Sequence, residues 1–355
     1  MHKILRPFCY CALAFAALWG VGGCATTPEP DIRPAVEAVH QLSPEELAER
    51  DDQFRQATAA FKLRYAVLYP RSFHGMDPTP ELNEIKALGF DRVLLVINSE
   101  AALDEELIRF FRCGAAAGLP LELVLRQRDY FPRRRANRLL SFVLPNYPDL
   151  PKAAAMVREF HHRLLEEGLP GLAGFNVVFE PHMFNAVSGR SGGAGELYQW
   201  SDGTFGPGLD NDLMVLKSAE IFRQLPFDDV PFTPIVSDDY HDWAMEGKLS
   251  FGRVRDLAGL ATPRPRLFLL LSGNRPTEMQ SRQQEEFADP GECLIPVLRI
   301  ADHLSVDSGA FRRRNWKDFI RGITFLSDHV AGLDSCGGVV IGPWRVVDYL
   351  RNEKD

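Results

Sequence analysis

The sequence has few cysteines, no block of positive charge and no glycine-rich phosphate loop. Its 355 residues include six cysteines, and none has the Cys-x-x-Cys or Cys/His spacing of a structural zinc site. Forty basic residues against 48 acidic ones give a net charge of −8, which excludes a sequence-independent grip on nucleic-acid phosphates. Neither G-x-G-x-x-G nor G-x-x-x-x-G-K-[ST] follows a predicted strand. We therefore expect no nucleic-acid partner, no cofactor and no resident metal.

The composition is that of a folded globular chain, with 45% hydrophobic and 25% charged residues. The first residues differ from the rest. His2, Lys3 and Arg6 form a short basic region, and the apolar stretch Pro7–Leu18 is too short to cross a bilayer as a helix. Small residues and a cysteine follow, so we expect residues 1–23 to be a secretory signal peptide.

The segment Val21–Cys24 resembles the lipobox of bacterial lipoproteins. The resemblance implies that Cys24 is acylated, with palmitate among its chains, and becomes the mature N-terminus. The acyl chains would then provide the membrane attachment, because an acidic body does not bind anionic lipid by itself. By resemblance to enterobacterial sorting, Ala25 indicates the outer membrane or the periplasmic face of the cell envelope. The alternative is a cleaved export signal with an incidental cysteine.

The polar, Pro-containing residues 25–31 predict a tether. Ser43, Pro44 and Glu46 combine an N-cap, a proline in the first helical turn and a capping box, which predicts a helix to about Ala60. We therefore expect a lipidated N-terminus, tether and helix over residues 24–60 and a compact domain over residues 61–355.

The compact domain alternates short apolar runs with helical patterns. We predict strands at Leu63–Tyr69, Arg92–Ile97, Leu121–Arg126, Gly174–Glu180, Phe232–Asp238, Arg266–Ser272 and Gly338–Ile341. We predict helices at Pro80–Leu88, Ala102–Ala117, Pro151–Glu167, Asn211–Gln224 and Arg314–Ala331. Repeated βα units without a linker-like break favour one α/β domain, a (β/α)8 TIM-like barrel, over a doubly wound sheet.

Two features of this region stay open. Cys293–Ile300 fits a seventh strand, but Leu294, Val297 and Leu298 also fit one helix face. Cys113, Cys293 and Cys336 allow at most one disulfide, and the apolar helical context of Cys113 predicts a buried thiol.

In a barrel, chemistry lies at the carboxyl ends of the strands. The period of two in the fourth strand places Phe175 and Val177 on the helix-facing side, and Asn176 and Glu180 on the lumen side. In the third strand Leu121, Leu123 and Leu125 share the outer side. Glu122 and Arg126 share the lumen side, so Arg126 either enters the mouth or pairs with Glu122 lower in the lumen.

Glu180-Pro181-His182 resembles the acid/base position of (β/α)8 glycoside hydrolases of the large retaining clan, with Phe179 where that clan has Asn. Residues 173–180 also resemble the chitinase-like motif Asp-Gly-x-Asp-x-Asp-x-Glu: Gly174 and Glu180 match, and Ala173, Asn176 and Val178 stand at its aspartates. Gly337–Trp344 is similar to the last strand of such barrels. The resemblance implies Glu180 as acid/base, with His182 and Trp344 as sugar contacts.

Glycosidic cleavage needs a second carboxylate. Asp238 and Asp239 follow the fifth strand, and neighbouring strands lie about 4.8 Å apart, which suits the roughly 5 Å separation of a retaining pair. Tyr240 and His241 are candidate hydrogen-bond donors beside them. One of the two aspartates is expected to be a helix N-cap. A divalent metal held by Asp238, Asp239, His241 and His182 is an alternative without a compact ligand motif.

Two long loops frame the predicted mouth. Residues 181–210 are rich in glycine and carry Trp200, which favours a sugar platform over a disordered linker. Arg133–Arg135, in the other loop, either binds an anionic group or forms a solvated loop face. The sequence thus predicts a glycoside hydrolase that cleaves a poly- or oligosaccharide at the envelope through Glu180 and a strand-five aspartate, with Arg126 also at the site. The alternative is a non-catalytic carbohydrate-binding or envelope-assembly lipoprotein with a degenerate barrel.

Overall fold

The computed structural model divides the chain into two compact units, Met1–Val39 and His40–Asp355. It describes residues 42–97, 103–125, 149–178, 230–237, 266–270, 293–301, 311–312 and 315–353. All of these residues belong to the second unit. The predicted signal peptide, Cys24 and the predicted tether therefore lie outside the described residues.

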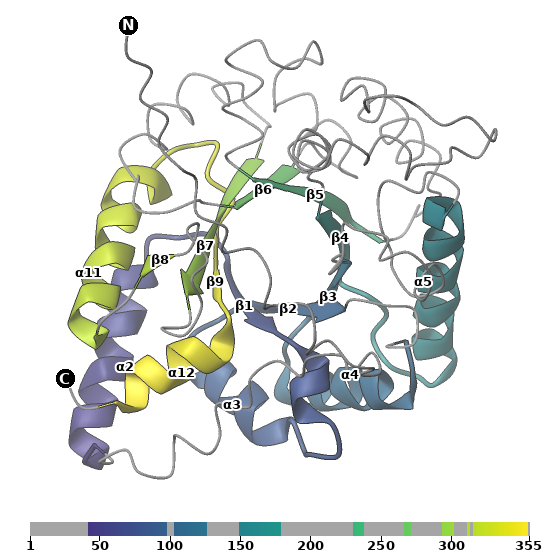
Figure 1. Ribbon diagram of the computed structural model, residues 1–355, viewed down its shortest axis with the longest axis horizontal. Coiled ribbons are helices and arrows are strands. Elements are labelled where there is room, and N and C mark those ends of the chain that lie inside the picture. Colours follow the sequence, from purple (N-terminus) through teal and green to yellow (C-terminus); the bar gives the residue numbers. More distant parts are fainter. Residues whose placement is uncertain are drawn as a thin grey trace, which may run out of the picture. The chain divides into compact units, whose positions relative to one another are not determined.

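The second unit is built on a curled sheet of parallel strands (Figure 1). In chain order the strands are β1 (Arg64–Leu68), β2 (Arg92–Ile97), β3 (Leu121–Leu125), β4 (Gly174–Val178), β5 (Phe232–Ser237), β6 (Arg266–Leu270), β7 (Cys293–Ala301), β8 (Phe311–Arg312) and β9 (Val339–Gly342). From β1 to β7 each strand pairs with the next, and β9 pairs with both β7 and β1. The ring of pairings therefore returns to its first strand. Strand β8 lies outside the ring and pairs with the last two residues of β7.

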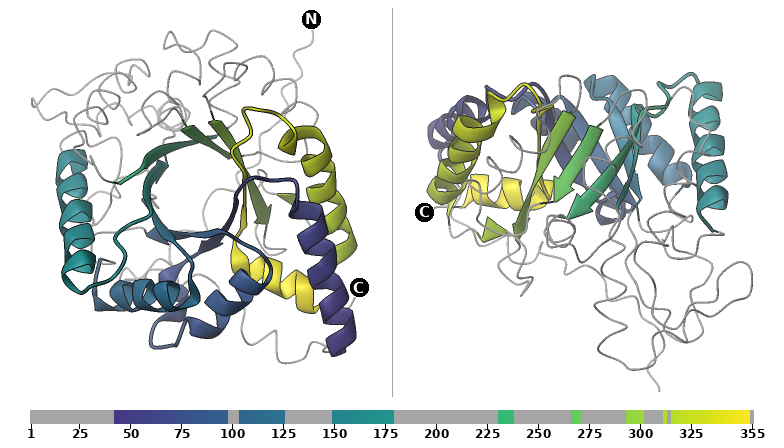
Figure 2. Two further views of the ribbon diagram at one scale, coloured as in Figure 1. Left: turned by 180° about the vertical axis from the view of Figure 1, so that it is seen from behind. Right: turned by 90° about the horizontal axis from the view of Figure 1, so that it is seen from above.

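Helices lie outside this ring in both face-on views (Figures 1 and 2). They are α2 (Pro44–Thr58), the short η1 (Pro70–Phe73), α3 (Thr79–Ala87), α4 (Glu105–Ala117), α5 (Asp149–Glu166), α11 (Trp316–Leu326) with its π-helical continuation η4 (Ser327–Ala331), and α12 (Trp344–Asn352). The predicted helix Asn211–Gln224 and the connections after β4, β5 and β6 lie outside the described residues. The parallel α/β sheet is thus confirmed, and the full (β/α)8 alternation stays a prediction.

Side chains on the two faces of the strands form two apolar layers. Val93, Leu123 and Phe175 belong to the outer layer, which packs under the helices. The inner layer, in the lumen of the ring, contains Tyr65, Leu94, Val96, Val124, Ile235, Phe268, Ile295, Val297 and Val340. This division follows from the alternation of side chains along a strand. It confirms the predicted faces of β3 and β4.

Local signals explain where the helices begin and end. Ser43 and Glu46 form the predicted capping box of α2, with reciprocal bonds of 3.2 and 2.7 Å. Asp104 and Asn315 cap α4 and α11 by accepting backbone N–H bonds. Gly118 ends α4 in the left-handed region at φ 65°.

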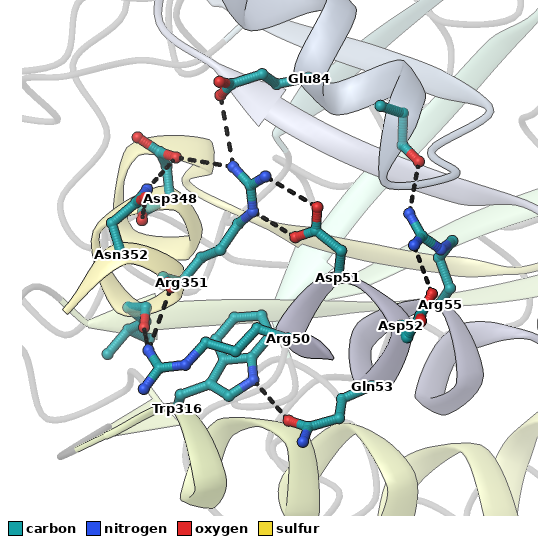
Figure 3. A network of polar contacts seen from close by, with 12 residues as sticks. Arg50, Asp51, Asp52, Gln53, Arg55, Glu84, Trp316, Asp348, Arg351 and Asn352 are labelled. Atoms are coloured by element: carbon teal, nitrogen blue, oxygen red, sulfur yellow. Dashed lines mark hydrogen bonds and ion pairs between the residues drawn. The ribbon is translucent and has the colours of Figure 1, made fainter. Parts of the chain in front are cut away.

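Helix α2 is fixed to α12 and α11 by polar contacts (Figure 3). Arg351 of α12 donates two hydrogen bonds, of 2.5 and 3.0 Å, to the Asp51 carboxylate. Arg50 donates to the last carbonyls of α12, and the Trp316 indole of α11 donates to Gln53 at 3.0 Å. The N-terminal helix is therefore an integral part of the folded unit.

The structure resolves the helix-or-strand alternative for one segment. Residues 293–301 are a strand, paired along its length with β6 and β9.

Other described side chains are placed as follows. Cys113 and Cys336 are both free thiols, the first partly buried and the second fully buried. On α5, His161 is half-buried beside Gly171 and accepts the Leu172 N–H at 3.0 Å, while the adjacent His162 is exposed. Within the described ranges, no helix is both long and apolar enough to cross a bilayer.

Candidate functional site

The lower lumen, at the amino ends of the strands, holds a buried polar network. Glu122 is fully buried and forms an ion pair with Arg92 at 2.7 Å. Its second carboxylate oxygen accepts a hydrogen bond from the Asn176 amide at 3.0 Å. Gly174 makes this possible, because a Cβ there would lie 2.6 Å from the Glu122 carboxyl carbon. The described partners of Glu122 are Arg92 and Asn176. Arg126, expected either in the mouth or beside Glu122, lies outside the described residues, so both alternatives stay predictions.

The electrostatics of this network fit a structural role. Burial acts to lower the pKa of Arg92, but the neighbouring Glu122 carboxylate outweighs it, so the net shift of the Arg92 pKa is upward. The Arg92 guanidinium therefore stays charged beside Glu122. The Asn176 side-chain oxygen is buried and has no hydrogen-bond partner among the described residues. We assign the network to the floor of the lumen and not to the reacting site.

The inner layer becomes more exposed toward the carboxyl ends of the strands. On β2, exposure rises from 2% at Leu94 to 8% at Val96, and on β7 it rises from 0% at Ile295 to 7% at Val297. On β1, Tyr65 is fully buried, whereas Tyr69 just beyond the strand is half-buried. Along β1, β2 and β7 the described inner-layer side chains are thus slightly more exposed toward the carboxyl ends. Tyr69 is a candidate that the sequence analysis did not single out, although it follows the same alternation as Tyr65.

The described carboxyl ends of β4 and β5 lie side by side. The register pairs Asn176 with Thr233 and Val178 with Ile235. Phe232 belongs to the outer layer and Ile235 to the inner layer. The last described residues of β4 and β5 therefore lie at adjacent points of the same edge of the sheet.

Most of the predicted site residues follow those strand ends and lie outside the described residues. They are Arg126, Glu180, His182, Trp200, Asp238, Asp239, Tyr240 and His241. Their roles remain predictions. The described strands β3, β4 and β5 end one to four residues before seven of them, all except Trp200.

Trp344 is described, and its position differs from the predicted sugar contact. It is 1% exposed and belongs to the outer layer, with its ring edge-on to Phe90 at 6.1 Å between centroids. The cause is the abrupt start of α12 directly after β9, which places Trp344 between sheet and helix. In this structure Trp344 is a core residue.

The rim beside β1 is a segment that we call the rim loop, residues 69–78, and it is held from two sides. From α12, Arg345 donates to the Ser72 carbonyl at 2.6 Å and stacks over the Phe73 ring. From α4, Glu106 accepts the Gly75 N–H at 2.7 Å and pairs with His74. The loop is therefore ordered by side chains of two helices that follow different strands.

Charge supports the same arrangement. Burial disfavours the ionised form of Glu106, but hydrogen bonds from Gly75 and His74 together outweigh it and lower the pKa of Glu106. Arg109 adds a 2.5 Å bond to the Met76 carbonyl. Gly75 takes φ 72°, a conformation that favours glycine. Among the described residues no group of His, Cys, Asp and Glu side chains could hold a metal ion.

Comparisons with known proteins give similarities of fold alone. No protein-family model and no curated protein matches the chain. Among solved structures, xylanase B from Clostridium stercorarium F9 has 14% sequence identity and a TM-score of 0.44, covering 81% of this chain and 87% of its own. A rice β-glucosidase has 10% identity and a TM-score of 0.45, covering 81% and 90%. A citrate synthase, SbnG, has 11% identity and a TM-score of 0.37, covering 84% and 93%.

These neighbours include two glycoside hydrolases and one enzyme of different chemistry. At such identities the likeness concerns the parallel α/β fold and does not select a reaction. The function must therefore be argued from the site.

Proposed function

We propose that this protein is a carbohydrate-active envelope lipoprotein that cleaves a glycosidic bond at the carboxyl-end mouth of its lumen. The observation that carries the proposal is the register of β4 and β5, which brings Asn176 opposite Thr233 and Val178 opposite Ile235. Glu180 and the aspartate pair follow these two strands within a few residues. Adjacent parallel strands are about 4.8 Å apart, which suits two carboxylates acting on one bond.

The described faces of the strands favour Asp239 over Asp238 as the partner of Glu180. Every second residue of a strand shares a face, so the lumen face of Asn176 extends to Glu180 if the alternation continues. Counting by two from Ile235, which belongs to the inner layer, leads to Asp239. By the same alternation Asp238 falls on the opposite face, and it suits the N-cap of a following helix. In this proposal Glu180 is the general acid/base and Asp239 is the anionic nucleophile or base.

Substitution of each aspartate tests this assignment. Asp239→Asn is expected to lower glycan hydrolysis by roughly 10²–10⁴-fold, with binding retained. Asp238→Asn, the matched control, is expected to lower thermal stability modestly and leave turnover within a few-fold. Equal loss of turnover in both variants, or loss only in Asp238→Asn, contradicts the assignment of Asp239.

The second candidate function is non-catalytic carbohydrate binding. The observation that favours it is the lumen face of β4, where Gly174 and Asn176 serve the buried network around Glu122 instead of providing further carboxylates. Binding without turnover by the unmodified protein would select this function.

The proposed anchor is the acylated Cys24, supported by the sequence Val21–Cys24 and the polar stretch after it. The test is fatty-acid labelling in a bacterial host. Cys24→Ser is expected to abolish incorporation of labelled palmitate and to prevent sedimentation of the protein with membranes. Unchanged labelling of the variant would remove the lipoprotein assignment.

A further inference from the structure

We propose that Tyr69 is a sugar-binding residue at the floor of the mouth, where its ring contacts the apolar C–H face of a pyranose. The inference rests on the proposed function, which it deepens by naming a substrate contact. It does not depend on Glu180 or either aspartate being catalytic.

The first support is the place of Tyr69 on the strand. Tyr65 and Val67 precede it by steps of two, and all three pack against the inner layer of the lumen. Tyr65 is fully buried and stacks edge-on with Phe268 at 5.4 Å between centroids. Val67 and Tyr69 are half-buried, so the lumen face of β1 becomes more exposed from Tyr65 toward the carboxyl end of the strand.

The second support is the chemistry of the side chain. Across the described part of the chain, no hydrogen bond to the Tyr69 hydroxyl occurs, whereas Tyr349, another half-buried tyrosine, donates to Glu353 at 2.7 Å. Tyrosine hydroxyls in partly buried positions usually find a partner. A ring packed on an apolar floor, with a hydroxyl available at the mouth, matches a sugar, which offers both a C–H face and hydroxyl groups.

The third support is the rigidity of the rim loop. The Tyr69 carbonyl accepts the Ser72 N–H at 2.9 Å, which begins the turn. Phe73 anchors the turn in the core, edge-on to Phe110 at 5.4 Å. The bonds from Arg345 on one side and from Glu106 and Arg109 on the other fix the carbonyls and amides that follow. The backbone from Tyr69 onward is thus fixed by these bonds, which limits the conformational entropy that this segment loses on binding.

The test measures oligosaccharide binding by calorimetry, using the full mature chain carrying Glu180→Gln so that turnover does not deplete the probe. The probes are defined gluco-, xylo-, manno- and N-acetylglucosamine oligosaccharides. Tyr69→Leu keeps apolar volume and removes the ring, so we expect about 10- to 100-fold weaker binding. Tyr69→Phe keeps the ring, so we expect binding within about five-fold of the parent. Tyr349→Leu, the matched control on α12, is expected to leave the binding constant unchanged.

The melting temperature separates a binding role from a structural one. The inference requires that Tyr69→Phe and Tyr69→Leu melt close to the parent while only Tyr69→Leu loses affinity. Equal affinity of the parent and Tyr69→Leu overturns the role of Tyr69 and leaves the proposed function intact. Loss of affinity only in proportion to loss of folded protein assigns Tyr69 to the core and also overturns the inference. If neither the Glu180→Gln chain nor the unmodified protein binds any probe, the proposed function and this inference are both overturned.

Discussion

Asp348 of α12 is a partly buried carboxyl group beside Glu84 and the guanidinium of Arg351 (Figure 3). Burial is the main cause that raises the pKa of Asp348 to about 6, and Glu84 and Glu81 raise it further, against the lowering effect of Arg351 and Asn352. The ordinary value is 3.8, so between about pH 4 and pH 6 the folded state binds a proton that the unfolded state does not. Stability contributed by this group therefore increases as the pH falls from about 7 to about 4.

We expect Asp348→Asn to remove this pH dependence. The measurement is urea unfolding of the parent and the variant at several pH values between 7 and 4. The parent should gain stability relative to the variant on acidification through pH 6. A difference between the two proteins that stays constant across this range would show that Asp348 titrates at the same pH in both states.

Gly174 is the residue on which the lower lumen depends most directly. Its missing Cβ leaves room for the Glu122 carboxyl group, which would otherwise lie 2.6 Å away. Gly174→Ala is expected to lower the free energy of unfolding by about 1–3 kcal/mol through overpacking. Gly332→Ala is the matched control, because a Cβ added at Gly332 would have no atom within 4 Å, and it should change stability by less than about 0.5 kcal/mol. Similar melting curves for both variants would contradict the close approach of Glu122.

The docking of α2 on α12 includes an ion pair between the two helices. Asp51 of α2 holds Arg351, whose side chain is only 9% exposed, whereas the neighbouring Asp52 pairs with Arg55 of the same helix and is 65% exposed. Asp51→Asn is expected to cost about 1–3 kcal/mol, because it removes the carboxylate that hydrogen-bonds a largely buried guanidinium and leaves it only the longer ion pairs with Glu84 and Asp348, at 3.7 and 3.6 Å. Asp52→Asn should cost less than about 0.5 kcal/mol. Chemical unfolding that gives equal costs for the two variants would show that the α2–α12 ion pair contributes no more than a surface pair.

Strands and helices were predicted best from the sequence where apolar residues follow a single periodicity. The alternation in β3 and β4 assigned Glu122, Phe175 and Asn176 to the faces that the structure shows. It did not decide between helix and strand for residues 293–301, because apolar residues such as Leu294, Val297 and Leu298 satisfy both periods and only pairing with β6 and β9 selects the strand. Strand β8, with two residues, is too short for any pattern to predict.

At the scale of the whole molecule, contacts between distant segments were not predictable from the sequence. The pairing of Glu122 with Arg92 and the burial of Trp344 against Phe90 depend on which strands and helices become neighbours in the closed ring. The position of Tyr69 in the mouth likewise depends on the rim loop, whose partners come from α4 and α12. Local patterns thus predicted the parallel sheet, and tertiary contacts determined which of the described residues are structural. The site at the carboxyl edge of the sheet stays a prediction.

The central claim is that Glu180 acts as the acid/base of a glycosidic cleavage at the end of β4. The most direct measurement is the release of new reducing ends from the oligosaccharide probes by the parent and by Glu180→Gln, with binding of the same probes measured in parallel. We predict that Glu180→Gln lowers turnover by roughly 10²–10⁴-fold, because the amide keeps the volume and removes the proton donor, while binding is retained. Full turnover by Glu180→Gln would contradict the claim, as would a parent protein that binds a probe and never cleaves it.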